Sequence, residues 1–194
     1  MPLIDWGVFR IHVGDCIEAM ASMRPESARC CVTSPPYFGL RDYGHDGQIG
    51  LEETPDAFVQ KMVEVFREVR RVLTPDGTLW LNLGDSYAAN RPYQVPSTKG
   101  GKKHGDAQAA GGKSSTVPPG LKAKDLMGIP WRMAFALQAD GWILRQDIIW
   151  HKPNPMPESV RDRCTKAHEY LFLLSKSGRY YFDSAAMQEP AAWC

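Results

Sequence analysis

The chain has 194 residues, of which 43% are hydrophobic and 23% charged, and its formal net charge is +1. This length suits a single domain over residues 1–194 with a sizeable hydrophobic core, and the composition is that of a globular protein. No apolar run approaches the roughly 18 residues of a membrane span, and Asp5 and Arg10 interrupt the N-terminal apolar residues in a way that a secretory signal does not. We therefore expect a cytoplasmic protein with no membrane partner.

The cysteines argue against a structural metal or a disulfide framework. There are five, an odd number, and none is in Cys-x-x-Cys spacing. Reduced thiols in an intracellular protein fit this pattern better than zinc ligands or disulfides. We therefore predict no metal site.

The first predicted unit is a strand followed by a helix. Apolar residues alternate over residues 9–13, which indicates a strand, and residues 16–23 have an apolar helical face. Gly14 and Asp15 lie between them, an order typical of nucleotide-facing loops in doubly wound sheets. Asp15 could equally well cap the helix, because one carboxylate can serve either role.

A rigid loop follows the next predicted strand. Apolar residues 30–32 lead directly into Thr33-Ser34-Pro35-Pro36-Tyr37. Each proline fixes its own φ and removes an N–H, and Pro35 also keeps Ser34 out of the helical region. The loop is therefore stiff, and it lies at a strand end, where open α/β sheets bind ligands.

The groups on this loop suit an exocyclic amine of a nucleobase. The nitrogen lone pair of such an amine is delocalised into the ring, which makes the amine a poor nucleophile. The Ser34 hydroxyl and the Pro35 carbonyl could accept both amine hydrogens and localise the lone pair. The Tyr37 ring could stack on a base that has left its duplex. The alternative is a proline-terminated strand entering an ordinary loop.

Residues 38–87 predict a loop, a helix and a second strand. Residues 38–50 are rich in glycine and polar residues, which indicates a mobile loop where Arg41 and Tyr43 could contact DNA. Thr54-Pro55-Asp56 has the cap, the proline and the acid of a helix start, and helical spacing continues to Leu73. After a predicted turn at 74–77, a strand over 78–83 ends in Gly84-Asp85, which we expect beside the Ser34 loop.

Residues 88–124 predict a basic, flexible loop. They have little periodicity, and residues 91–124 contain seven Lys and Arg but only one acidic residue. This segment carries about +6, so the rest of the chain carries about −5. Such a loop is either a nucleic-acid-binding element, whose phosphate contacts would make binding salt-sensitive, or an insertion with incidental lysines. The candidate DNA contacts are Lys99, Lys102, Lys103 and Lys113.

The C-terminal third predicts a helix and several strands. Ile129-Pro130 begins a helix that Gly141 would end, and residues 142–150 indicate a strand. Residues 151–159 contain three prolines and predict irregular structure. Residues 170–174, a turn at 176–179 and residues 180–182 predict an antiparallel hairpin. The fold class is therefore α/β, a partial doubly wound and mainly parallel sheet with a C-terminal antiparallel hairpin.

Several segments together resemble the amino-group DNA methyltransferases. Ser34-Pro35-Pro36-Tyr37 resembles their catalytic motif, and further segments are similar to theirs in the same order: Gly14-Asp15, residues 81–87, residues 150–159 and residues 168–170. That family uses S-adenosyl-L-methionine to methylate cytosine N4 or adenine N6. The resemblance implies a Rossmann-like methyltransferase fold, double-stranded DNA as partner, and a restriction–modification role in a bacterial or phage-like cytoplasm.

The resemblance also implies roles for single residues. Ser34, Pro35, Pro36 and Tyr37 would be catalytic, and Lys152 and Asn154 would contact DNA. Serine at the first motif position goes mostly with cytosine N4, which we favour over adenine N6. Asp15 would bind the adenine end of the cofactor, and the full set of predicted cofactor-binding residues is Asp15, Cys16, Thr33, Ser34, Gly84 and Asp85.

The resemblance ends near Glu189-Pro190. Family members of this motif order continue with a target-recognition segment and a glycine-rich Phe-x-Gly-x-Gly loop for the cofactor, which these 194 residues lack. We therefore expect a truncated product, one half of a split enzyme, or a divergent member. The isolated chain should bind cofactor weakly and expose an apolar sheet edge that favours a complementing chain or a homodimer. An inactive DNA-binding remnant, or a methyltransferase for RNA or a protein amide, are the alternatives.

Overall fold

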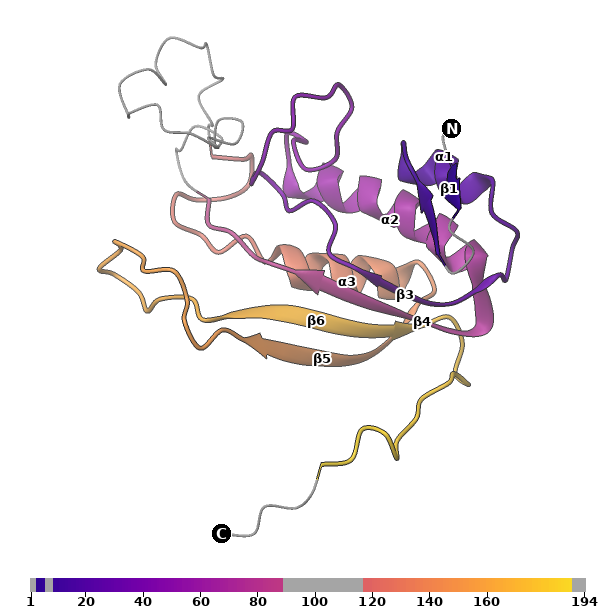
Figure 1. Ribbon diagram of the computed structural model, residues 1–194. Coiled ribbons are helices and arrows are strands. Elements are labelled where there is room, and N and C mark those ends of the chain that lie inside the picture. The colour runs from indigo at the N-terminus through magenta and orange to yellow at the C-terminus, as the bar shows by residue number, and fades with distance from the viewer. Residues whose placement is uncertain (1–2, 6–8, 89–116, 190–194) are drawn as a thin grey trace.

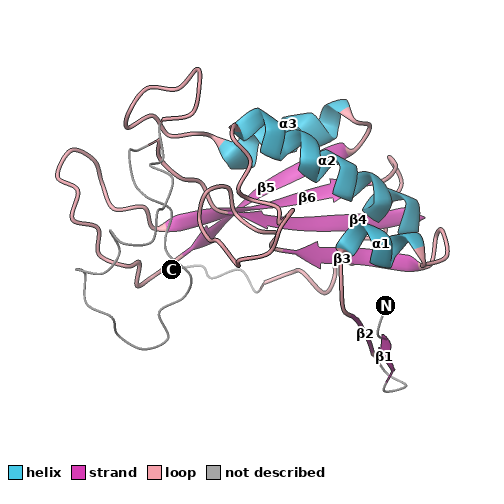
Figure 2. Ribbon diagram, turned by 90° about the horizontal axis from the view of Figure 1, so that it is seen from above, coloured by secondary structure: helices cyan, strands magenta, loops and turns pink. Residues whose placement is uncertain are grey.

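The computed structural model describes residues 3–5, 9–88 and 117–189, and within them a four-stranded sheet carries helices on one face (Figures 1 and 2). Among these residues, no helix combines the length and the apolar character needed to cross a bilayer. The elements are β1 (Leu3–Asp5), β2 (Arg10–His12), α1 (Cys16–Ala21), β3 (Ala28–Thr33), α2 (Pro55–Val72), β4 (Leu73–Leu83), α3 (Ile129–Ala139), β5 (Ile143–His151) and β6 (His168–Ser175).

The strand order of the main sheet is β3-β4-β6-β5. β3 pairs with β4 in parallel, whereas β6 is antiparallel to both β4 and β5. β3, β4 and β5 therefore point the same way, and β6 runs against them. This confirms the predicted α/β class, with a mixed sheet in which β3–β4 is parallel and the pairings β4–β6 and β5–β6 are antiparallel.

Helix α2 forms where its start signal predicts. The Thr54 hydroxyl accepts a hydrogen bond from Ala57 N at 3.1 Å, and Pro55 occupies the first turn. Phe58 and Met62 are fully buried on the apolar side of the helix, which packs on the sheet. Burial of this stripe, more than helix propensity, holds α2 in place.

Strand β4 divides its side chains between two unlike faces. Leu79, Leu81 and Leu83 have no exposed surface and face the helices. Trp80 and Asn82 point to the opposite face, because side chains alternate along a strand. The hydrophobic core therefore lies on one side of the sheet.

Three details differ from the sequence prediction. The expected turn at 74–77 lies within β4, where the register with β3 shifts between Ala28 and Cys30. β2 pairs with β1 in a separate two-stranded sheet, so Gly14 does not follow a strand of the main sheet. The β1 segment was not predicted at all.

The prediction of a second hairpin strand over residues 180–182 is also wrong. β6 already pairs with β4 on one edge and β5 on the other, so no edge of it is free for a returning strand. The chain instead bonds to the start of β4, through Tyr181 N to Asp76 O at 3.2 Å. The antiparallel pair at this end of the protein is β5–β6.

A pair of truncations tests the one-sided core. Leu79→Ala should lower the free energy of unfolding of this chain by about 2–5 kcal/mol, because it leaves a cavity among fully buried side chains. Val32→Ala, on the neighbouring strand but 76% exposed, should change it by less than about 0.5 kcal/mol. If urea denaturation showed that both variants lower the free energy of unfolding equally, the result would contradict the one-sided packing.

Candidate active site

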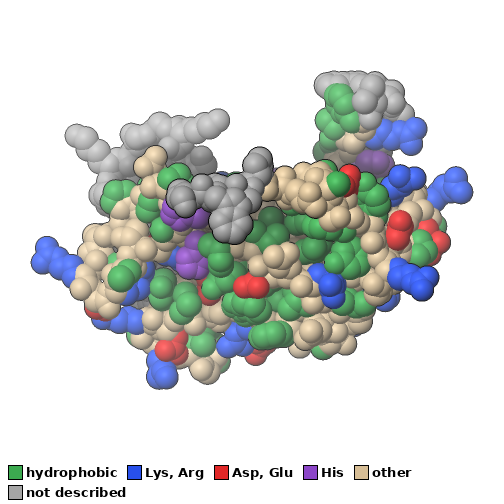
Figure 3. All heavy atoms as spheres, turned by 90° about the horizontal axis from the view of Figure 1, so that it is seen from below, with side chains coloured by type: hydrophobic (Ala, Val, Ile, Leu, Met, Phe, Trp, Pro, Cys, Tyr) green, Lys and Arg blue, Asp and Glu red, His purple; other side chains and the backbone are tan. Residues whose placement is uncertain are grey.

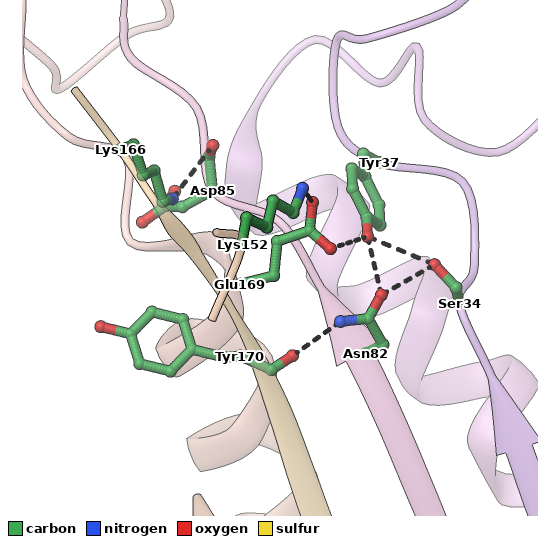
Figure 4. Close-up of polar contacts among 8 residues, drawn as sticks. All are labelled: Ser34, Tyr37, Asn82, Asp85, Lys152, Lys166, Glu169 and Tyr170. Carbon is green, nitrogen blue, oxygen red and sulfur yellow. Dashed lines mark hydrogen bonds and ion pairs between the residues drawn. The ribbon is translucent and has the colours of Figure 1, made fainter. Parts of the chain in front are cut away.

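The tips of three strands meet at one edge of the main sheet. Parallel β3 and β4 both end there, and β6 begins there, with Leu83 of β4 paired to Tyr170 of β6. Ser34 follows the last residue of β3, Asn82 lies one residue before the end of β4, and Glu169 lies near the start of β6. The topology thus brings together side chains that are far apart in the sequence (Figure 4).

The hydroxyl group of Tyr37 is the centre of a hydrogen-bonded cluster. It lies 3.0 Å from Asn82 Oδ1, 3.3 Å from Glu169 Oε2 and 3.3 Å from Ser34 Oγ (Figure 4). Ser34 Oγ is also 3.3 Å from Asn82 Oδ1. Below, these four residues are called the phenol cluster.

The amide of Asn82 is oriented by the backbone. Its Nδ2 donates to the Tyr170 carbonyl at 3.2 Å, so its Oδ1 faces the two hydroxyl groups. A hydroxyl group has one proton and two acceptor lone pairs. When Ser34 donates its proton to Asn82, its oxygen is left free to accept hydrogen bonds from a ligand. Ser34 is exposed, so a ligand can reach it.

The Tyr37 ring is held against the tip of β4. A Cβ atom at Gly84 would lie 2.7 Å from Tyr37 Cε2, closer than real Cβ contacts allow. The absence of a side chain at Gly84 makes room for the ring, and the predicted role of Gly84 in cofactor binding stays a prediction. The next residue, Phe38, is buried against Phe58 of α2, which anchors the loop.

An ion pair backs the phenol cluster. Lys152, which follows β5, pairs with Glu169 (Figure 4). Burial opposes ionisation of the Glu169 carboxyl, but the hydrogen bond and charge of Lys152 outweigh it and hold its pKa below the ordinary value. Burial, followed by the Glu169 charge, raises the pKa of the Tyr37 phenol. Tyr37 therefore remains a protonated donor beside an ionised acceptor.

Asp85, a predicted cofactor ligand, caps a helix. Its carboxylate accepts hydrogen bonds from the backbone N–H groups of Gly128 and Ile129, both at 3.1 Å, and of Ser86 at 2.9 Å. Gly128 precedes α3 and has no side chain of its own to cap it. Lys166 donates to the Asp85 carbonyl at 3.3 Å, and burial lowers the pKa of that lysine.

Asp15 also caps a helix, as its alternative interpretation predicted. Its Oδ1 accepts from Ile17 N at 2.8 Å and from Glu18 N at 3.1 Å. The neighbouring Cys16 is exposed as a residue, but its thiol is partly buried, and this partial burial, followed by the Asp15 charge, raises the pKa of the thiol. Their roles in cofactor binding remain predictions.

The other predicted site residues differ in how far they are exposed. Thr33 ends β3, Pro35 is half-buried and Pro36 is exposed. The predicted DNA contacts Arg41, Tyr43 and Asn154 are exposed, whereas Lys152 is half-buried in its ion pair. The remaining predicted contacts lie outside the described residues: Lys99, Lys102, Lys103 and Lys113.

A hollow of about 490 Å³ opens beside Ser34 on the face opposite the helices. Its walls are mostly apolar, and Ser34 and Asn82 add the polar groups. The lining residues are Val32, Thr33, Ser34, Trp80, Asn82, Trp150 and Leu171.

Sequence reasoning missed two members of the phenol cluster. Asn82 and Glu169 lie in segments that carry the resemblance, but neither was given a role. The signal for Asn82 is a polar residue in the otherwise apolar run Leu79–Leu83, one position before the strand ends. Glu169 has no comparable signal, because its partners come from the segment after β5 and from the Tyr37 loop.

Comparison with known proteins identifies the family. A family model described as DNA methylase matches residues 28–192. The chain belongs to this DNA methylase family. It is 54% identical over 191 residues to the type II methyltransferase M.XycI of Xanthomonas campestris pv. cyanopsidis, covering 98% of this chain and 61% of that protein. Across three such family relatives the chain spans 61%, 57% and 61% of their length.

Solved structures support the fold. A protein described as a DNA modification methylase of Thermus thermophilus, in complex with S-adenosyl-L-methionine, aligns with a TM-score of 0.58 at 26% identity. That alignment covers 90% of this chain and 56% of the other. The PvuII DNA methyltransferase, described as cytosine-N4-specific, aligns with a TM-score of 0.61 at 18% identity over 91% of this chain and 52% of its own.

The ion pair behind the phenol cluster is tested by Lys152→Met. Removal of the ammonium should raise the pKa of the Glu169 carboxyl, measured by carbon NMR of labelled glutamate. The pKa of Glu169 is lower in the folded state than the value of about 4.3 in the unfolded state, so ionised Glu169 stabilises the fold at pH values above the latter. This stabilisation is lost as the pH falls through the pKa of the folded state. The decrease in the free energy of unfolding as the pH falls should therefore be smaller in Lys152→Met. Lys61→Met, which removes an exposed lysine of α2, should leave the Glu169 titration unchanged; an unchanged titration in Lys152→Met would contradict the assignment.

Proposed function

We propose that this chain is the catalytic part of an S-adenosyl-L-methionine-dependent DNA methyltransferase that acts on an exocyclic amine of a flipped base, with cytosine N4 as the favoured target. The observation that carries the proposal is the exposed Ser34 hydroxyl at the tip of β3, backed by Asn82 and Tyr37. The type II methyltransferase relatives support a restriction–modification role inside the cell.

The chain's own residues would prepare the amine. Ser34 Oγ and the Pro35 carbonyl accept its two hydrogens, which favours a pyramidal nitrogen whose lone pair is localised. Pro36 keeps the loop stiff, and the Tyr37 ring, supported by Gly84, stacks on the base. The cofactor would supply an electrophilic methyl group.

No strong general base is required in this scheme. The nitrogen is cationic once it has gained the methyl group, and in this state it loses a proton readily to water. No covalent bond to the protein forms. The protein contributes orientation and preorganised acceptors, the usual sources of rate enhancement where a site has no nucleophile.

The described residues fit the cofactor only in part. Asp85 is engaged by three backbone N–H groups, and Asp15 caps α1. A Cβ at Gly84 would meet the Tyr37 ring, and of the predicted cofactor residues only Thr33 and Ser34 are among those that line the hollow.

The partial fit favours two alternatives. A DNA-binding remnant or a single subunit of a split enzyme would keep the fold and the basic segment yet bind cofactor weakly. Micromolar or tighter binding of S-adenosyl-L-methionine by the purified monomer, measured by calorimetry, would contradict both of these weak-binding alternatives. Adenine N6 remains the alternative target, since a hydroxyl could serve either amine.

A methylation assay tests the proposed reaction. The chain is incubated with double-stranded DNA, labelled S-adenosyl-L-methionine and the part of the Xanthomonas relative that it does not match, and the DNA is digested for mass spectrometry of nucleosides. We expect N4-methylcytosine. N6-methyladenine would establish the alternative target, and absence of any methylated base would contradict the enzyme.

The Ser34→Ala variant in the same assay separates chemistry from binding. Loss of one preorganised acceptor should lower turnover by about 10²-fold and change the DNA dissociation constant by less than about threefold. Ser27→Ala, at an exposed serine whose hydroxyl bonds the Arg24 carbonyl, is the matched control and should leave both unchanged. Equal losses of turnover and affinity in Ser34→Ala would argue against a chemical role.

A further inference from the structure

The carboxylate of Glu169 divides its two oxygens between two partners. Oε1 forms the ion pair with Lys152, and Oε2 lies 3.3 Å from the Tyr37 hydroxyl (Figure 4). The Glu169 side chain is only 21% exposed, and a carboxylate is costly to remove from water even where a cation compensates it. For stability alone, a neutral side chain of similar size often serves as well as such an ion pair. The negative charge of Glu169 is therefore better explained by a use in the site.

Two hydroxyl groups connect this carboxylate to the tip of β3. The Tyr37 hydroxyl lies 3.3 Å from Glu169 Oε2 and 3.3 Å from Ser34 Oγ. A charged acceptor forms the stronger hydrogen bond, so the Tyr37 proton goes to Glu169 rather than to the Asn82 amide. Ser34 then donates to Tyr37 or to Asn82, and in both cases its oxygen keeps lone pairs for a ligand. Hydrogen bonds in such a chain polarise one another, which makes these lone pairs more negative.

The other charged groups near Glu169 are occupied by different partners. The Asp85 carboxylate, just after β4, accepts three backbone N–H groups at the start of α3. Lys166, in the segment before β6, donates to the Asp85 carbonyl, and the titratable ring of His168 packs edge-on against Tyr170. Among residues 9–88 and 117–189, Glu169 is thus the one carboxylate that is hydrogen-bonded to the hydroxyl groups of the phenol cluster.

The surroundings of Ser34 on the side opposite the helices are mainly apolar. Val32, Trp80 and Trp150 line the hollow beside it. Figure 3, which views the molecule from this side, shows hydrophobic side chains gathered over the sheet. A charge is screened less in apolar surroundings than in water. The field of Glu169 therefore acts on a group bound at Ser34 with less screening than at an open polar surface.

We propose that Glu169 is a positioning residue for the methyl transfer, and that its negative charge acts through Tyr37 on Ser34 to stabilise the positive charge that develops on the amine nitrogen. This role rests on the proposed function. The nitrogen lone pair forms the new bond to the methyl carbon, the electron pair of the broken bond stays on the sulfur, and one amine proton is afterwards lost to water. The positive charge thus arrives at the nitrogen as the new bond forms.

This arrangement favours the transition state over the bound amine. The hydrogen bond from the amine to Ser34 Oγ strengthens as the nitrogen becomes cationic, and it strengthens more when that oxygen is already polarised by Glu169. An interaction that is stronger in the transition state than in the ground state raises the rate. Because Tyr37 and Glu169 are already in place, no rearrangement is needed during the reaction.

The first measurement needs no activity and uses the purified chain. Carbon NMR of tyrosine labelled at Cζ follows the titration of the Tyr37 phenol, whose pKa is raised by burial and then by the Glu169 charge. Glu169→Gln removes that charge and should lower the pKa of the phenol. Glu68→Gln is the matched control, because the Glu68 side chain is 29% exposed and pairs with Arg71, and it should leave the titration unchanged. An unchanged Tyr37 titration in Glu169→Gln overturns the proposal.

The second measurement is the single-turnover rate at saturating DNA, in the methylation assay used for Ser34→Ala. Glu169→Gln should lower this rate about tenfold and change the DNA dissociation constant by less than about threefold. Glu68→Gln should leave both unchanged. A merely structural role predicts equal losses of rate in Glu169→Gln and Lys152→Met, because both variants break the same ion pair. Our proposal predicts that Lys152→Met, which keeps the negative charge, is faster than Glu169→Gln at neutral pH.

The pH dependence of the rate separates the two roles further. The charge of Glu169 is present above the pKa of its carboxyl in the folded chain, and it is lost as the pH falls through that pKa. Lys152 holds this pKa below its ordinary value against the opposing effect of burial. In Lys152→Met the fall of the rate at acid pH should therefore begin at higher pH than in the unchanged chain. In Glu169→Gln this dependence on the carboxyl should be absent.

The outcomes distinguish this proposal from the proposed function. Methylation by the unchanged chain together with a full rate in Glu169→Gln overturns the role of Glu169 alone. Absence of methylation by the unchanged chain, with the Tyr37 titration as expected, overturns the proposed function and the role of Glu169 with it. If Glu169→Gln does not unfold cooperatively in urea, Lys152→Met decides the question, since an acid fall of the rate that does not move to higher pH overturns the proposal.

Discussion

The hydrogen bonds of the Tyr37 hydroxyl tie the Ser-Pro-Pro-Tyr loop to the ends of β4 and β6. Each of these hydrogen bonds contributes only about 0.5–1.5 kcal/mol net to stability. Together with the two prolines, the hydrogen bonds leave the loop few alternative conformations. Gly84 matters for the same reason, because any side chain there would displace the ring. The orientation of the Ser34 oxygen, and with it the proposed chemistry, follows from this arrangement.

The two faces of the main sheet have different roles, one in stability and the other in the candidate site. Leucines of β4 and the apolar stripe of α2 form a dry core on the helical side, and this core holds the strand tips in register. The opposite face carries the hollow, the Ser34 hydroxyl and exposed aromatic residues. A sheet that is stabilised from one side can leave the other available for a substrate.

Much of this could be predicted from the sequence where the signal is local. The Thr54-Pro55 start of α2, the alternating leucines of β4 and the proline loop after β3 all have short-range physical causes. The 180–182 strand was mispredicted because the pairing of β6 is decided by distant strands. The contacts that Asp85 and Lys152 make within the fold were not predicted, because a capped helix 43 residues away and a carboxylate on another strand are not visible in a linear pattern. The predicted roles of Asp85 in cofactor binding and of Lys152 in DNA binding stay predictions. Glu169 was missed for the same reason, because its partners Lys152 and Tyr37 are distant in the sequence.

The central claim is that the phenol cluster acts as one cooperative unit, and a double-mutant cycle on unfolding measures it most directly. Tyr37→Phe, Asn82→Ala and the double variant should show a coupling free energy of about 0.5–3 kcal/mol, because the two side chains share a 3.0 Å hydrogen bond and the same neighbours. The same cycle between Tyr37→Phe and Ser27→Ala should be additive within about 0.5 kcal/mol. Additivity in the first cycle as well would show that the Tyr37 loop is not held by this cluster, and the proposed preorganisation of Ser34 would fail with it.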